Sequence, residues 1–92
     1  MVNKIYSIFD KKSGLFSSLS LFVNHAAAMR SFQDAIATSG SIFCTHPEDF
    51  DLYCLGEFTE ENGFIHAIDP REFVVSAKVI CDIQKGECDA QT

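Results

Sequence analysis

Long apolar runs are missing from the sequence. No stretch of the 92 residues approaches the roughly 18 consecutive apolar residues of a membrane-spanning helix. The N-terminal region carries Lys4 but no continuous apolar segment of the secretory type, so we expect no signal peptide. These absences favour a cytoplasmic protein without a membrane partner.

Motifs of common catalytic sites are also missing. The sequence contains no Gly-rich phosphate-binding loop, no nucleophile elbow and no metalloprotease motif. His46 lies close to Glu48 and Asp49, a pattern compatible with acid–base chemistry. Capping of a short helical turn opened by Pro47 explains the same residues without catalysis, and we prefer this interpretation. We therefore expect that the protein is not an enzyme and uses no cofactor.

The cysteines lack the spacing of a zinc site. No pair stands two to four residues apart among Cys44, Cys54, Cys81 and Cys88. In a cytoplasmic protein we expect reduced thiols, and we expect Cys54 to pack as a small hydrophobic side chain. Folding could bring His46 and His66 close to two of the cysteines, so a structural metal is the less favoured alternative. The prediction is that there is no metal site.

Basic residues are scarce, with seven Lys and Arg against thirteen Asp and Glu and a net charge of −6. A negative net charge opposes contacts with nucleic-acid phosphates. The charge is unevenly distributed, however: residues 1–30 have a balance of +3, and residues 31–92 have a balance of −9. This asymmetry indicates a surface with two different partners, and an ordinary solvated surface is the alternative.

A packed core is indicated by the hydrophobic content of 47% and by nine phenylalanines. Alternation, capping residues and turn signals predict the elements. We expect strands over residues 3–10 and 15–23, a helix over 26–38, a short turn after residue 46, and strands over 52–58, 64–68 and about 73–80. Gly56 interrupts the alternation, which predicts a bulge or a close backbone approach.

The predicted fold class is α+β. The expected architecture is a small antiparallel sheet with one helix across a face, in the order β-β-α-β-β-β. A partly open barrel of the oligonucleotide-binding kind is the alternative. The domain is expected to span residues 1–80, with a polar, frayed tail over residues 81–92.

The second expected strand has an unusual pattern. Leu19, Leu21 and Val23 are predicted on its inner face, which leaves Phe16 and Phe22 on its outer face. Two exposed aromatic rings require a covering surface, either a ligand or a second copy. Together with the unpaired edges of the sheet, they predict a homodimer.

Three segments resemble one protein family. They read VNKIYSIFD at residues 2–10, AMRSFQD at residues 28–34, and HPEDFDLY followed by LGEF within residues 46–58. In this order they resemble the small non-structural protein of gokushovirus-type phages (Microviridae), which have circular single-stranded DNA genomes. The resemblance covers residues 2–70 and implies a protein of the infected bacterium's cytoplasm that is absent from the mature virion. It implies a biological setting more than a biochemical activity.

Two functional hypotheses follow from the resemblance and from the basic N-terminal region. The first is a sequence-tolerant single-stranded DNA-binding protein that acts in genome replication or packaging. Its candidate site residues are basic side chains for phosphates and rings for base stacking: Lys4, Lys11, Lys12 and Arg30, with Tyr6, Phe16 and Phe22. The alternative is a regulator whose acidic surface docks a basic protein, such as the phage replication initiator or a host replication factor.

Overall fold

The computed structural model of the protein describes residues 2–38 and 42–91, with side chains described as far as residue 84. The elements in chain order are β1 (Val2–Asp10), β2 (Leu15–Phe16), β3 (Ser20–Phe22), α1 (His25–Ala37), α2 (Ile42–Thr45), the 3-10 turn η1 (Pro47–Asp49), β4 (Phe50–Thr59), β5 (Ile65–Ser76) and α3 (Ala77–Gln91). None of the described helices is long and apolar enough to cross a membrane.

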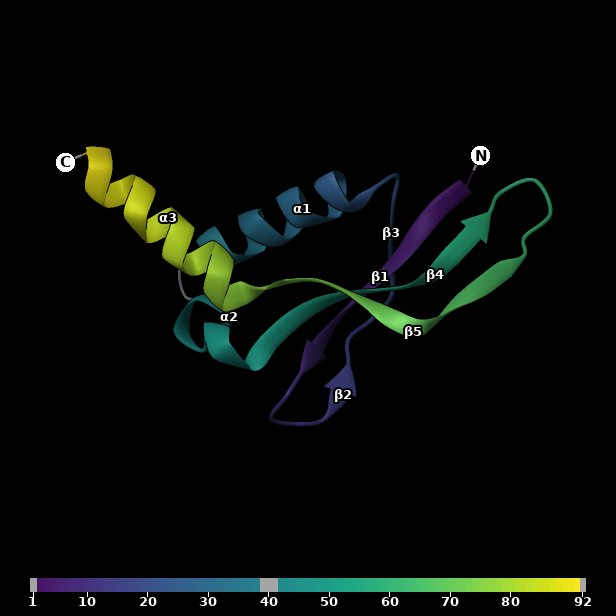
Figure 1. The fold of residues 1–92 in the computed structure, drawn as a ribbon, viewed down its shortest axis with the longest axis horizontal. Coiled ribbons are helices and arrows are strands. Elements are labelled where there is room, and N and C mark those ends of the chain that lie inside the picture. The colour runs from purple at the N-terminus through teal and green to yellow at the C-terminus, as the bar shows by residue number, and fades with distance from the viewer. Residues whose placement is uncertain (1, 39–41, 92) are drawn as a thin grey trace.

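The strands form one antiparallel sheet in the order β2-β1-β4-β5, and β3 also pairs with β1. The expected α+β class is therefore confirmed. The described strands leave β5 at an open edge, so the sheet is not closed into a barrel. In Figure 1, α1 and α3 lie along one side of the sheet, and the β4–β5 hairpin extends away from α3.

The core lies between the sheet and these two helices. It is formed by Tyr6, Ala28, Phe32, Ile36, Phe50, Leu52, Cys54, Val75, Ala77, Ile80 and Cys81. Helix α1 begins where the sequence predicts, because the Asn24 side chain accepts a hydrogen bond from Ala27 N–H at 2.9 Å. Its buried residues, Ala28, Phe32 and Ile36, are spaced by four and therefore share one face.

The expected strand over residues 15–23 is broken into β2 and β3. At the break, the Ser17 hydroxyl oxygen accepts a hydrogen bond from Ile8 N–H at 3.0 Å. In a continuous strand a backbone carbonyl would accept this hydrogen bond instead. The break changes which side chains face the core, since a one-residue slip reverses the faces of a strand. Phe22 is half-buried against the core, whereas Leu21 is 48% exposed. The predicted faces were therefore wrong for Leu21 and Phe22.

The predicted C-terminal end of the last strand was also wrong. The two expected strands after the hairpin are one strand, β5, which ends at Ser76. Residues 77–91 form α3, where we expected the end of a strand and a frayed tail. Ser76 caps this helix by accepting a hydrogen bond from Val79 N–H at 3.2 Å. Ile80 and Cys81 are buried, so the helix packs on the core.

Candidate functional site

One face of the sheet carries no helix, and we call it the open face. Tyr6 pairs with Cys54, and Ile8 pairs with Leu52, on the face that packs against the helices. Because successive side chains of a strand point to opposite faces, Phe9 lies on the open face. The same alternation places Tyr53, between Leu52 and Cys54, beside it.

Four rings meet on the open face, and we call them the aromatic cluster: Phe9, Phe16, Tyr53 and Phe73. Each comes from a different strand, namely β1, β2, β4 and β5. The ring centroids of Phe9 and Phe16 are 4.8 Å apart. Tyr53 lies 5.8 Å from Phe16 and 5.7 Å from Phe73. The cluster therefore crosses the whole width of the sheet, with Phe73 at 52% and Phe16 at 36% exposure.

Arg71 joins the cluster from strand β5. Its guanidinium carbon lies 5.3 Å from the centroid of Phe16 and 5.9 Å from that of Tyr53. Both distances are within the range of cation–π attraction. The contacts hold a permanent positive charge over the rings, so this surface offers stacking groups and an anion-binding group together.

Three of the seven predicted site residues lie at the same end of the sheet. Phe16 belongs to the aromatic cluster, and Lys11 and Lys12 occupy the turn between β1 and β2. The Lys11 ammonium lies 3.4 Å from the carboxylate of Asp51, which is nearly buried, so part of its charge is already compensated. Lys12 is exposed.

The other four predicted residues belong to the helix-bearing side. Tyr6 is only 1% exposed, and its hydroxyl lies 2.6 Å from Nδ1 of His25. Burial raises the pKa of Tyr6 to about 12. Phe22 packs edge-on against Tyr6, Lys4 pairs with Phe22 in the sheet, and Arg30 lies on α1 beside Phe22. The structure thus removes Tyr6 as a stacking platform and separates these residues from the open face.

The sequence prediction missed Phe9, Tyr53, Arg71 and Phe73. The spacing of Arg71 and Phe73 was an available signal, because residues two apart in a strand share a face. Asp69, Pro70 and Glu72, however, have the pattern of a helical cap, so the expected strand begins only at about residue 73. Alternation within the strand expected over residues 52–58 places Tyr53 opposite Leu52, but its partners across the sheet depend on a register that the sequence does not show.

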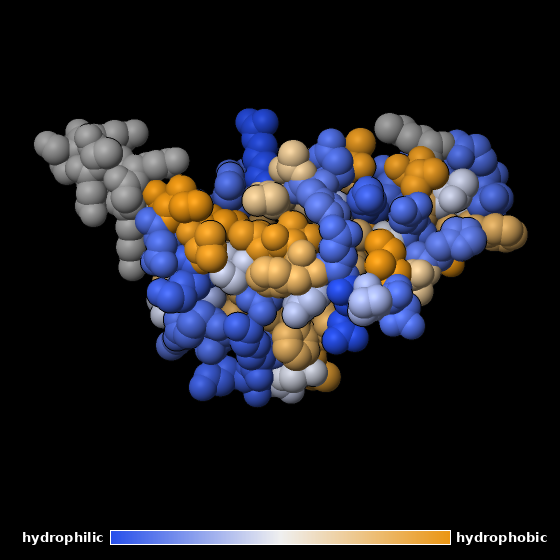
Figure 2. All heavy atoms as spheres, in the orientation of Figure 1, coloured by the Kyte–Doolittle hydropathy of each residue, from blue (hydrophilic) through white to orange (hydrophobic). Residues whose placement is uncertain are grey.

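A second apolar surface on the open face lies nearer the hairpin. We call it the aliphatic basin, and it is lined by Ile5, Leu19, Leu21, Phe58 and Ile65. Leu19 and Ile65 are 62% and 67% exposed. The hairpin turn beside it carries Glu60, which accepts a hydrogen bond from Asn3 at 2.6 Å. Figure 2 shows hydrophobic side chains at the surface in the middle of the view and toward the hairpin.

Gly56 allows the strands around the basin to approach each other. A side chain at this position would collide with the carbonyl oxygen of His66 on β5. The pairing register shifts between Cys54 and Gly56. The predicted bulge or close approach at this glycine is therefore confirmed.

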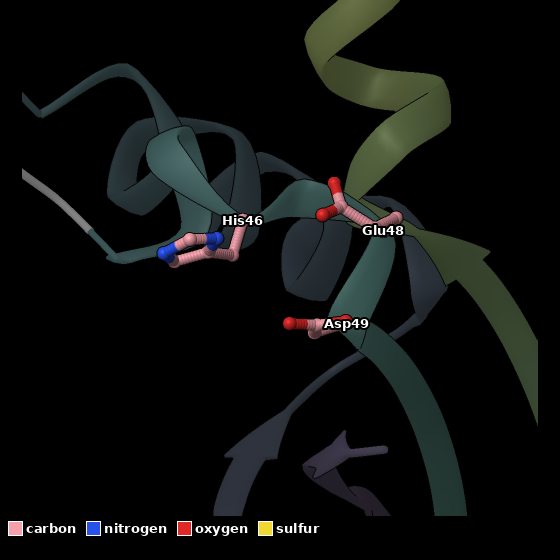
Figure 3. A group of neighbouring side chains, drawn as sticks. All are labelled: His46, Glu48 and Asp49. Atoms are coloured by element: carbon pink, nitrogen blue, oxygen red, sulfur yellow. The ribbon is translucent and has the colours of Figure 1, made fainter. Parts of the chain in front are cut away.

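A group of possible metal ligands lies at the start of β4. The donor atoms of His46, Glu48 and Asp49 all lie within 4.8 Å of one another. Figure 3 shows their side chains around the short turn η1. An imidazole and two carboxylates are donors that first-row divalent cations accept.

Comparisons with known proteins agree with the resemblance seen in the sequence. The family described as Phage ORF5 protein matches residues 3–80. Protein ORF5 of Chlamydia phage 1 is 35% identical over 86 residues, covering 89% of this chain and 82% of the relative. No solved structure gives a significant match. The match spans both surfaces of the open face, and the chain belongs to the Phage ORF5 protein family.

Proposed function

We propose that the protein binds single-stranded DNA through the open face of its sheet and is not an enzyme. The observation that carries the proposal is the aromatic cluster with Arg71 lying over it. In the setting of a phage with a single-stranded genome, such binding would serve replication or packaging. It would take place in the cytoplasm of the infected bacterium rather than in the mature virion.

The aromatic cluster has the chemistry of a base-stacking platform. Every base has a π-face, so stacking on a ring is tolerant of sequence and contributes about 1–3 kcal/mol per base. Phe73 and Phe16 have free ring surface, since they are 52% and 36% exposed. Stacked bases would cover apolar surface that now faces water, which favours binding.

The charge distribution supports a limited number of phosphate contacts. Arg71, Lys11 and Lys12 are the basic residues at this end of the open face, and the chain as a whole carries a charge of −6. With three phosphate contacts to a single strand, the logarithm of the binding constant should fall with the logarithm of the salt concentration with a slope of about −2. The acidic remainder of the chain repels DNA and would restrict it to this face.

Titration of a fluorescently labelled oligonucleotide, followed by anisotropy, tests the proposal with matched pairs of variants. Phe73→Ala should weaken binding about 5- to 160-fold, the equivalent of losing one stacked base at about 1–3 kcal/mol. Phe64→Ala is its control, because Phe64 is 60% exposed but its ring contacts His66 near the hairpin turn. Arg71→Ala should reduce the salt slope by about 0.7, whereas Arg30→Ala on α1 should not. Absence of binding at low salt would contradict the proposal, and so would an equal loss of oligonucleotide affinity in Phe73→Ala and Phe64→Ala.

The aliphatic basin favours a second candidate function, which is docking of a basic protein. Apolar side chains beside an acidic turn would suit a segment that combines apolar and basic residues. The phage replication initiator or a host replication factor is the expected kind of partner. Calorimetric titration with such a protein should show salt-dependent binding that Leu21→Glu abolishes. Val23→Glu is the control, because Val23 is similarly exposed, at 54% against 48% for Leu21, but does not line the basin.

A further inference from the structure

The segment from His46 to Asp49 brings together donor groups that the proposed DNA contact does not use. One imidazole nitrogen and two carboxylate oxygens lie within 4.8 Å of one another. His46 and Glu48 are exposed and Asp49 is half-buried, so a dissolved ion can reach all three. In Figure 3 the three side chains extend from one short turn toward the same side of the chain.

Backbone hydrogen bonds hold this turn in place. His46 N–H donates to the Ile42 carbonyl at 2.9 Å, and Asp49 N–H donates to the His46 carbonyl at 3.1 Å. The Asp49 carbonyl accepts a hydrogen bond from Lys11 N–H at 2.8 Å, which fixes the turn to the sheet. Pro47 restricts the backbone further. The backbone that carries the three donors is therefore held in place.

The His46 side chain is not used as a cap. The sequence predicted a capping role for His46, but its side chain makes no capping hydrogen bond. The ammonium of Lys11 contacts the Asp51 carboxylate at 3.4 Å and the Glu48 backbone carbonyl at 3.3 Å. The carboxylates of Glu48 and Asp49 thus place two negative charges beside an imidazole, an arrangement that a cation would stabilise.

We propose that His46, Glu48 and Asp49 together bind one divalent first-row cation, with Mn²⁺ and Zn²⁺ as the best fits. The mixed nitrogen and oxygen donors favour these ions over Ca²⁺, which takes oxygen donors only. Donors that share an ion at about 2.1 Å lie at most about 4.2 Å apart, so closure needs only a small rotation of exposed side chains. The remaining coordination positions take water or another oxygen donor.

Binding of Mn²⁺ to the metal-free protein, followed by electron paramagnetic resonance, tests the proposal. Mn²⁺ prefers carboxylate and imidazole to thiolate, so the exposed Cys44 nearby does not compete. The wild-type protein should bind one equivalent. His46→Gln and Glu48→Gln should each weaken binding tenfold or more, as expected for the loss of one of three ligands. The control variant combines His66→Gln with Glu60→Gln, which removes the same groups from the hairpin region and should bind as the wild type does.

The outcomes separate this proposal from the proposed function, because no DNA is present in the experiment. Absence of saturable Mn²⁺ binding would overturn the metal site. Equal affinity in His46→Gln and wild type, or equal loss in the control variant, would overturn it as well. Circular dichroism of each variant checks that the fold is retained. Glu48→Gln is a conservative substitution that leaves the backbone of the turn unchanged, so it provides a second test beside His46→Gln.

Discussion

Among Gly14, Gly56 and Gly63, Gly56 has the least room for a side chain. A Cβ atom there would meet the backbone of His66, which cannot move without displacing β5. We therefore expect Gly56→Ala to lower the free energy of unfolding by about 1–3 kcal/mol.

Urea denaturation measures the free energy of unfolding of this variant, and Gly63→Ala serves as the comparison. Gly63 has a φ of +74° but open space around it, so its substitution carries only the conformational cost of about 1 kcal/mol. If Gly56→Ala proved no more destabilising than Gly63→Ala, the close approach of β4 and β5 would be disproved.

Glu72 gives a second prediction at the scale of the residue. Its carboxylate lies 2.8 Å from Nε2 of His25, and this hydrogen bond holds the pKa of Glu72 below its usual value. A group whose pKa is depressed by folding stabilises the protein above its unfolded pKa, and this stabilisation is lost as the pH falls through its folded pKa. Wild type should therefore be more stable than Glu72→Gln at neutral pH, and the difference should shrink under acid conditions.

Thermal unfolding of both proteins between pH 7 and pH 3 measures this difference. Glu48→Gln is a suitable control, because Glu48 is an exposed carboxylate on the 3-10 turn η1. A constant gap between wild type and Glu72→Gln over this pH range would show that the His25–Glu72 contact does not depend on the carboxylate charge.

Among the elements, α1 was predictable from local signals and α3 was not. Asn24 and the spacing of Ala28, Phe32 and Ile36 identify α1 without knowledge of the rest of the chain. In α3, the β-branched Val79 and Ile80 favour a strand by local preference. The packing of Ile80 against the sheet overrides that preference, as tertiary contacts commonly do.

Helix α3 offers a direct test through two isoleucines. Ile80 is 3% exposed and Ile83 is 56% exposed. Ile80→Ala should destabilise the protein by about 2–5 kcal/mol, because it leaves a cavity in the core. Ile83→Ala should change stability by less than about 1 kcal/mol. Equal effects in chemical denaturation would indicate that this helix does not pack as described.

The candidate site was predictable only in part, because it too depends on tertiary contacts that local sequence patterns do not show. Phe16 and the lysines of the turn after β1 can be placed from local pattern alone. The grouping of Phe16 with Tyr53 and Phe73 requires the order and register of four strands. Tyr6 was misassigned because alternation shows that two faces exist but does not show which one the helices cover.

At the scale of the whole molecule, the aliphatic basin predicts self-association. Its exposed residues include Leu19, Leu21 and Ile65, and burying them against a second copy would remove apolar surface from water. We expect light scattering at micromolar concentration to give twice the chain mass of 10.2 kDa. Leu21→Lys should convert the dimer to a monomer. A monomeric wild-type protein would contradict the dimer and leave the basin free for a protein partner.

Nuclear magnetic resonance of the aromatic side chains tests most directly whether nucleic-acid bases stack on the open face, as we propose. Adding a single-stranded oligonucleotide should shift the ring signals of Phe16, Tyr53 and Phe73, because a stacked base changes the local ring current. The signals of the buried Tyr6, which is 1% exposed, and of Phe64 at the hairpin should stay in place. Shifts confined to Phe64, or a spectrum that the oligonucleotide leaves unchanged, would contradict the claim.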